Sequence, residues 1–311
     1  THTEDASKPR VSWEARGDGW LVRQYQLGCL SLLSYLLVSN GEAVVIDPQR
    51  DVEHYIADAA AEKATIRSVM LTHPHADFVA GHTELRHRTG ATILLSHAAN
   101  AEFPHQPLRD GDKVRNGLFT IEVWETPGHT PNAMTFLGSV PSAPVQPQWA
   151  FTGDTLFIGS IGRPDLLDTP PAELAKLSYA SIQRLKGLPD GTMVLPAHGA
   201  GSLCGAHLSP DTTSTIGAQK LTNSYLQIPS EASFIASVLS HQPTAPQYFR
   251  FNVEINRKGP PVVERVDAMP AAVDAATLNA FVQAGGWVVA VRAHAEYAAG
   301  HIRGALNLAL R

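Results

Sequence analysis

Short apolar runs alternate with polar, turn-rich segments along most of the chain, a pattern typical of an α/β protein. Leu32 to Val38 and Ala43 to Asp47 predict a hairpin of buried strands, because the Asn40-Gly41 pair between them favours a tight antiparallel turn. Other apolar runs bounded by glycine, proline or charged residues predict further elements. Strands are expected at Arg67 to Thr72, Thr92 to Ser96, Phe119 to Glu125, Trp149 to Gly153 and Thr192 to Pro196, and helices at Val52 to Ala64, Gly81 to Arg88 and Pro171 to Leu188.

A segment rich in glycine and proline separates this alternation from the C-terminal residues. It contains Gly259, Pro260 and Pro261, and a predicted helix over Ala275 to Ala284 and the apolar run Trp287 to Val291 follow it. About forty residues are too few for an independently stable domain, so this last unit is expected to be part of one. The division predicted is an N-terminal tail over 1–11, a large domain over 12–257, a linker over 258–270 and a partial α/β unit over 271–311.

The composition directs attention to small-molecule ligands. Hydrophobic residues make up 44% of the chain and charged residues 17%, and the formal net charge is -5. No basic run suggests a nucleic-acid or membrane-surface partner, and no apolar segment approaches the ~20 residues of a membrane span. The two cysteines, Cys29 and Cys204, argue against a disulfide framework and favour a reducing compartment. We expect a soluble, cytoplasmic protein, and a homo-oligomer remains open.

Six potential metal-binding side chains follow predicted strands, in loops flanked by glycine or proline. Such turns can hold an imidazole or a carboxylate toward a common point. A single histidine among the fourteen in the chain is more often a surface or hydrogen-bonded residue, but the ordered set predicts a metal site. Its members are His73, His75, Asp77, His129, Asp154 and His198.

The order of these residues carries a family resemblance. Four short motifs resemble the successive metal motifs of the metallo-β-lactamase superfold, over roughly residues 12–257. The resemblance implies an αββα sandwich, a fold that hosts many different reactions. The motifs are Thr72 to Asp77, Pro127 to His129, Gly153-Asp154 and Pro196 to His198.

Further stretches are similar to one branch of that superfold. Asp154 to Leu167, which contains Gly162-Arg163-Pro164-Asp165, is similar to the persulfide dioxygenases, also called sulfur dioxygenases. Gly199 to Gly205 resembles the form of that branch that is fused to rhodanese domains. Val288 to Leu308 looks like the first half of a rhodanese.

This branch implies one Fe(II) per chain, bound by His73, His129 and Asp154. Two histidines and one carboxylate leave coordination positions open for a substrate sulfur and for O₂. The implied reaction oxidises a low-molecular-weight thiol persulfide, glutathione persulfide in the family, to sulfite and the free thiol. The remaining members of the set are expected to orient the ligands through hydrogen bonds, and these are His75, Asp77 and His198.

Phe78 favours oxidation by a single metal over hydrolysis by two metals. In hydrolases of the superfold a second zinc would use Asp77, the residue at position 78, Asp154 and His198, and a phenyl ring offers no ligand atom. Zinc can also take water as a ligand, so zinc and a thioester hydrolase of glyoxalase II type remain the alternative.

Cys204 and Arg163 have two interpretations each. Cys204 lies among glycines shortly after His198, and it is either an exposed thiol that accepts sulfur or a small buried residue. The exposed form leads to a third hypothesis, a non-enzymatic sulfane-sulfur carrier. Arg163 either binds a carboxylate of the substrate thiol or pairs with Asp165 and holds the shape of its loop.

The chain also departs from the family pattern. Gly199-Ala200 stands where single-domain persulfide dioxygenases have Asp-Tyr lining the thiol pocket, which leaves the carrier thiol open. No cysteine follows Cys204, and Ala290 stands where rhodaneses have an aspartate before Arg292. We therefore expect the rhodanese-like unit to lack its catalytic loop and to transfer no sulfur.

Overall fold

The structure is a computed structural model of the 311-residue chain that describes residues 8–142, 146–166, 169–240, 244–263 and 271–309. Contacts divide the chain into two compact units, Thr1–Val262 and Val263–Arg311. Strand β1 (Pro9–Gly17) begins within the segment 1–11, which was expected to be an N-terminal tail. Residues 1–7 of that segment lie outside the described residues. The expected boundary at 270 also lies outside them, within 264–270.

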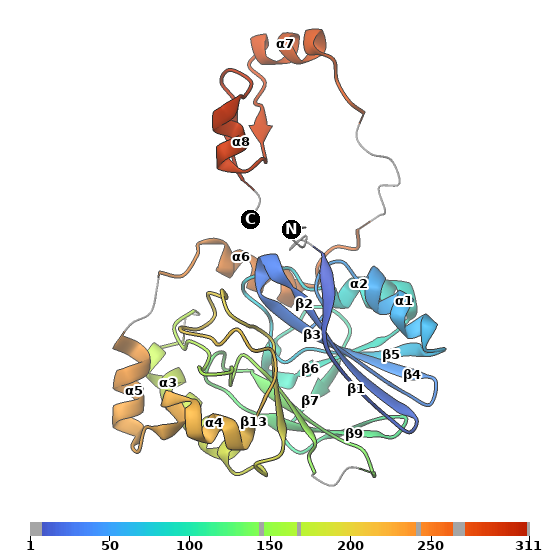
Figure 1. Cartoon of the computed structure of the whole chain (residues 1–311), viewed down its shortest axis with the longest axis vertical. Coiled ribbons are helices and arrows are strands. Elements are labelled where there is room, and N and C mark those ends of the chain that lie inside the picture. Colours follow the sequence, from blue (N-terminus) through green and yellow to red (C-terminus); the bar gives the residue numbers. More distant parts are fainter. Residues whose placement is uncertain (1–7, 143–145, 167–168, 241–243, 264–270, 310–311) are drawn as a thin grey trace. The chain divides into compact units, whose positions relative to one another are not determined.

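A seven-stranded sheet forms one half of the first unit (Figure 1). Its strands, in spatial order, are β1, β2 (Trp20–Leu27), β3 (Leu32–Ser39), β4 (Glu42–Ile46), β5 (Thr65–Met70), β6 (Thr92–Ser96) and β7 (Gln106–Leu108). The first four are antiparallel, and Asn40 and Gly41, both with positive φ, close the predicted β3–β4 hairpin. From β4 to β7 the strands are parallel, and α1 (Glu53–Ala61) and α2 (His82–Thr89) make the crossovers.

A six-stranded sheet forms the other half. Its spatial order is β13 (Ser214–Thr215), β12 (Met193–Pro196), β11 (Trp149–Gly153), β10 (Met134–Ser139), β9 (Phe119–Glu125) and β8 (Lys113–Asn116). The parallel pair β11 and β12 is connected through α3 (Pro171–Lys186), and the other pairs are antiparallel. Further helices are α4 (Ile216–Thr222), α5 (Glu231–Ser240) and α6 (Tyr248–Lys258), with 3-10 turns η1 (Gly28–Leu30), η2 (His97–Ala99) and η3 (Ser224–Gln227).

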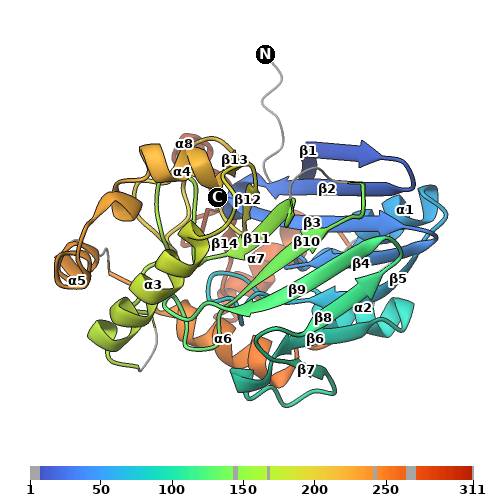
Figure 2. The same cartoon turned by 90° about the horizontal axis from the view of Figure 1, so that it is seen from below.

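Alternating side chains pack the two sheets face to face. Leu33 and Val44 of the first sheet meet Phe136 and Trp149 of the second in one apolar core. Each fully buried side chain of this size stabilises the fold by roughly 1.5–3 kcal/mol. The outer face of the first sheet packs against α1 and α2, and that of the second packs largely against α3, α4 and α5. The layers are therefore helix, sheet, sheet, helix (Figure 2), and the predicted αββα sandwich of the α/β class is confirmed.

The second unit is small. It consists of α7 (Ala275–Gln283), β14 (Val289–Ala290), α8 (His294–Ala299) and β15 (Leu306–Asn307), and the two short strands pair in parallel. The predicted helix over Ala275 to Ala284 corresponds to α7, whose N-cap is the side chain of Asp274. In the part of the chain that the structure describes, no helix combines the length and the apolar character that a membrane crossing requires.

Candidate metal centre

The six predicted donor residues meet at one edge of the sandwich, because each follows a strand that ends there. Two backbone hydrogen bonds align the loops: Met134 N donates to Thr72 O at 2.8 Å, and Ala197 N donates to Gly153 O at 2.9 Å. Gly153 has a φ of +52°, and a Cβ there would lie 2.6 Å from Thr72 Oγ1, so the approach of the two sheets requires glycine. His73, His75 and Asp77 follow β5, His129 follows β9, Asp154 follows β11, and His198 follows β12.

His73, His129 and Asp154 form a first donor group. Asp154 Oδ2 lies 3.7 Å from His73 Nε2 and 3.4 Å from His129 Nε2. These three atoms are buried and have no hydrogen-bond partner among the described residues. An ion with bonds of about 2.1 Å holds its ligand atoms roughly 3–3.5 Å apart, so the spacing fits one metal ion. Unpartnered buried polar atoms that converge in this way are costly unless an ion satisfies them.

The other ring nitrogen of each histidine in this group is fixed by a hydrogen bond. His129 Nδ1 donates to the carbonyl oxygen of Arg163 at 2.9 Å, which leaves Nε2 with its lone pair. Thr72 Oγ1 donates to Asp47 Oδ2 at 2.7 Å, so the same oxygen accepts from His73 Nδ1 at 3.1 Å. Both rings are therefore held with Nε2 directed at the carboxylate, as a metal ligand requires.

Asp47 is a functional residue that the sequence analysis missed. Its carboxylate is 1% exposed, and its Oδ1 accepts a hydrogen bond of 2.8 Å from Thr72 N. Asp47 follows the apolar run of β4, as the six predicted donors follow their strands. The rule that found those donors could therefore have found it as well.

His75, Asp77 and His198 form a second donor group. His198 contacts a carboxylate on each side: Nδ1 lies 2.7 Å from Asp154 Oδ1, and Nε2 lies 2.8 Å from Asp77 Oδ2. His75 Nε2 lies 3.0 Å from Asp47 Oδ1, but neither nitrogen of this ring has hydrogen-bond geometry to a described residue. His198 Nε2 and Asp77 Oδ1 also lack hydrogen-bond geometry to a described residue, so this group could hold an ion as well, although His198 Nδ1 is already bonded to Asp154.

Protonation separates the two groups further. Burial lowers the pKa of His73 and of His129, so both rings are neutral and can donate a lone pair. Burial works against ionised Asp154, but the His198 ring outweighs it through its charge and its hydrogen bond and holds the pKa of this carboxyl well below its usual range. Burial also opposes charge on His198, but Asp154 and Asp77 together raise the pKa of that ring well above its ordinary value.

Phe78 forms an apolar wall beside the second donor group. The residue is 5% exposed, and its ring centroid lies 4.5 Å from that of His75 and 6.4 Å from that of His198. It packs with Leu32 and Ala80. Position 78 therefore faces the second group, as the sequence suggested, and contributes no donor atom.

Cys204 is buried, which favours the second of its two interpretations. Its side chain is 1% exposed in a cluster with Ala76, Phe157 and Phe249, and burial raises the pKa of the thiol well above its ordinary value. The other interpretation, an exposed thiol that accepts sulfur, is contradicted by the structure. Phe249 of α6 covers the glycine-rich turn that contains Cys204. The sulfur lies close enough to Asp154 and His198 to form a third possible donor set with them.

Arg163 is also buried, at 1% exposure, and its guanidinium is bound to Asp165. Nε lies 2.7 Å from Asp165 Oδ1 and Nη2 lies 2.8 Å from Oδ2, a bidentate pair. Arg163 N donates to Cys204 O at 2.9 Å. The pairing with Asp165 is thus the arrangement present, and through its carbonyl oxygen Arg163 orients His129.

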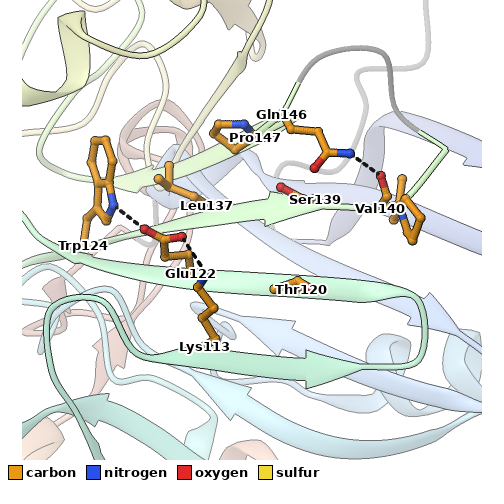
Figure 3. A pocket seen from close by; sticks show the side chains of 10 residues that line it. Lys113, Thr120, Glu122, Trp124, Leu137, Ser139, Val140, Gln146 and Pro147 are labelled. Carbon is orange, nitrogen blue, oxygen red and sulfur yellow. Dashed lines mark hydrogen bonds and ion pairs between the residues drawn. The ribbon is translucent and has the colours of Figure 1, made fainter.

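Two hollows lie at different places on the first unit. One of about 440 Å³ lies on the outer face of the second sheet, where Glu122 contacts Trp124 and Lys113 (Figure 3), and none of the six donors lines it. The other, of about 180 Å³, lies beside the donor loops. Its lining includes Pro74, Thr130, Asn132, Val253 and Arg257. None of the six donors is among its lining residues either, but Pro74 and Thr130 place it beside the loops that carry His73 and His129.

Comparison with known proteins agrees with this geometry. The model of the metallo-beta-lactamase superfamily matches residues 27–198, which include all six donors. The chain belongs to this superfamily. It is 32% identical to a metallo-beta-lactamase of Staphylococcus aureus subsp. aureus COL, whose solved structure superposes with a TM-score of 0.83 over 94% of this chain and 86% of that one.

Two further proteins to which the chain is similar have names that differ from each other. The solved structure of ETHE1 from Myxococcus xanthus is 30% identical, with a TM-score of 0.67 over 76% of this chain and 97% of that one. A hydroxyacylglutathione hydrolase of Hahella chejuensis (strain KCTC 2396) is 34% identical over 159 residues, 51% of this chain and 58% of the relative. The chain thus spans less than two thirds of that curated relative.

Proposed function

We propose that the protein is a mononuclear iron persulfide dioxygenase. A persulfide R–S–SH, O₂ and water would give the thiol R–SH, sulfite and two protons, and the substrate would be a small thiol persulfide such as glutathione persulfide. The observation that carries the proposal is the first donor group, in which two Nε2 atoms and one carboxylate oxygen converge without other partners. Two imidazoles and one carboxylate are typical of Fe(II) sites that use O₂.

The protein groups around this site suit a divalent ion. An Fe(II) ion held by His73, His129 and Asp154 would supply open positions where persulfide sulfur and O₂ can meet. Both histidines are neutral and the aspartate is ionised, so the ligands carry one negative charge and the ion retains net positive charge for an anionic persulfide.

His75, Asp77 and His198 would support the ligands without a metal of their own. His198 donates from Nδ1 to Asp154 Oδ1, which leaves Oδ2 for the ion. The charged ring also keeps Asp154 ionised. Phe78 supports this division, because it closes the second group with a hydrocarbon ring.

The hollow beside the donor loops is the proposed place for the non-reacting part of the substrate. Pro74 lies between His73 and His75, and Thr130 follows His129, so a molecule in this hollow would lie against both ligand loops. The resemblance of Asp154 to Leu167 to the persulfide dioxygenases supports a persulfide, and the relative named hydroxyacylglutathione hydrolase supports glutathione as its thiol.

The other parts of the assignment are proposed with it. For 271–311 we propose a rhodanese-like unit, supported by the parallel β14–β15 pair. We also propose a reducing, cytoplasmic setting, which the two unbridged cysteines Cys29 and Cys204 support. The carrier hypothesis loses support, because a buried thiol with a raised pKa is a poor nucleophile.

A zinc-dependent thioester hydrolase of glyoxalase II type is the second candidate. Two observations favour it: the relative named hydroxyacylglutathione hydrolase, and the second donor group, whose three donor atoms lie within 4.8 Å of one another. Two metal ions could then act together on a thioester carbonyl.

An oxygen-electrode assay separates the two candidates. Protein loaded with iron under nitrogen should consume O₂ when glutathione persulfide is added and should release an equal amount of sulfite. The same preparation should leave S-lactoylglutathione intact under nitrogen. Hydrolysis of the thioester without O₂, together with no O₂ uptake on the persulfide, would replace the proposal by the second candidate.

A further inference from the structure

Side chains of α6 hold the backbone of the loop that carries His75 and Asp77. Asn256 Nδ2 donates to His75 O and to Phe78 O, each at 2.8 Å, and Asn256 Oδ1 accepts from Ala80 N at 2.9 Å. One turn earlier, Asn252 Nδ2 donates to Ala76 O at 3.0 Å. The two asparagines therefore bind four backbone groups between residues 75 and 80.

Asn256 is fully used in this contact. It is 3% exposed, both hydrogens of its amide nitrogen are donated, and its oxygen accepts from the same loop. Asn252 and Asn256 are four residues apart, so they lie on one face of the helix. Phe249 anchors this face in the cluster that contains Ala76. The helix is thus a rigid support for a loop that belongs to neither strand nor helix.

A continuous chain of polar contacts leads from this loop to the carboxylate of the first donor group. Asp77, inside the segment held by Asn256, lies 2.8 Å from His198 Nε2. His198 Nδ1 lies 2.7 Å from Asp154 Oδ1, and Asp154 Oδ2 faces the two histidines of the first group. A shift of the loop would move Asp77, then the His198 ring, then the carboxylate.

We propose that Asn256 is a positioning residue for Asp154, acting through Asp77 and His198. The inference rests on the metal centre of the proposed function, but not on which reaction occurs there. An asparagine about a hundred residues beyond Asp154 in the sequence would thereby set the metal affinity of the first donor group. Partners that orient a ligand typically change metal affinity by about 10- to 100-fold when removed.

Cobalt(II) binding to the full chain tests the proposal without using turnover. The visible absorption of cobalt(II) reports both the dissociation constant, by competition with a chelator, and the geometry of the ligands. Asn256→Ala should weaken cobalt(II) binding about tenfold and alter the absorption bands. Asn256→Asp should act in the same direction, because it keeps the acceptor for Ala80 N and loses both donors.

Asn116→Ala is the matched control. Asn116 is 1% exposed and its side chain also donates to a backbone carbonyl, that of Glu42, but it lies in β8 and contacts none of the donor loops. Its loss should lower stability and leave cobalt(II) affinity unchanged. Unchanged affinity in Asn256→Ala, or an equal loss in Asn116→Ala, would overturn the proposal.

A second pair of variants shows whether the effect passes through Asp77. In an Asp77→Asn background, Asn256→Ala should cost less than about twofold further in affinity, because the link is already weakened. Fully additive losses would contradict the relay.

If Asn256→Ala does not fold, Asn252→Ala provides the test. This variant loses a single hydrogen bond and should weaken cobalt(II) binding about threefold. No change there would equally overturn the proposal. No O₂ uptake by the iron-loaded wild-type protein, with cobalt(II) affinities that still change in the variants as expected, would overturn the proposed reaction and support this inference.

Discussion

The two donor groups have the same kinds of side chain, two histidines and one aspartate, but differ in how those side chains are held. In the first group, each histidine has Nδ1 fixed by a hydrogen bond and Nε2 left unpartnered. In the second, His198 lies against a carboxylate at both nitrogens but has hydrogen-bond geometry only at Nδ1, and His75 has neither nitrogen hydrogen-bonded. The first group directs three unpartnered donor atoms at one point, whereas the second contains the ring that donates to Asp154.

This difference shows that a list of ligand residue types does not determine how many metals bind. Neutral rings beside an ionised carboxylate attract a cation, whereas a charged imidazole between two carboxylates offsets the charge of one of them. Phe78 reinforces the difference on the side of the second group.

Removing a ligand of the first group should have the largest effect. His73→Ala or His129→Ala should reduce bound metal to near zero and lower turnover by about a thousandfold, because the ion supplies several kcal/mol of stabilisation. Metal analysis and an activity assay on the same samples measure this. His87→Ala, at an exposed histidine of α2, is the control and should retain both properties.

Restoring an imidazole at position 78 should convert the second group into a metal site. Phe78→His should raise the metal content from one toward two per chain and introduce hydrolysis of S-lactoylglutathione, because a second ion gains a ligand. Phe78→Leu, which keeps the wall apolar, should do neither. A wild-type protein that already binds two ions would break the distinction between the groups.

Changing the link between the groups should have an intermediate effect. His198→Asn should weaken metal binding about 10- to 100-fold, because Asp154 loses the partner that orients it and keeps it ionised. His54→Asn, at a half-buried histidine packed on Tyr55, serves as control. Equal losses in both variants would mean that His198 contributes only to general stability.

In protein stripped of metal, the pKa values of histidines in the two groups should be shifted in opposite directions. By NMR, the pKa of His198 should lie above 6.5 and those of His73 and His129 below it. The stabilisation due to His198 is then present below pH 6.5 and is lost as the pH rises through its raised pKa. The contribution of His73 and His129 has the opposite sign: it is present above pH 6.5 and is lost as the pH falls. Titration of all three near 6.5 would contradict the assignment.

Removing the buried thiol should have the smallest effect on turnover. Cys204→Ala should keep persulfide oxidation within about threefold of wild type, because the protonated thiol is not a nucleophile. Mass spectrometry after exposure to a persulfide should find no added sulfur on Cys204, with Cys29→Ala as the matched variant. A stable persulfide on Cys204 would revive the carrier hypothesis.

The donor set could be predicted from the sequence because each donor lies in the loop that follows a strand. The strands at Thr92 to Ser96, Phe119 to Glu125 and Trp149 to Gly153 have the predicted bounds. Strand β1 was missed, because charged residues such as Arg10 and Glu14 interrupt its apolar pattern on an exposed edge.

Contacts between distant segments could not be predicted in this way. Asn256 binds carbonyl groups 178 and 181 residues away, and a side chain that binds backbone atoms needs no particular residue type in its partner. The burial of Cys204 depends on Phe249 in a helix that the sequence analysis did not predict. The glycines around Cys204 suggested exposure only because that cover was missing from the prediction.

Anomalous diffraction from crystals loaded with iron under nitrogen tests the difference between the groups most directly. One peak should lie among His73 Nε2, His129 Nε2 and Asp154 Oδ2, with none beside Asp77 and Phe78. Two peaks of similar height, one in each donor group, would contradict the assignment of a single metal to the first group.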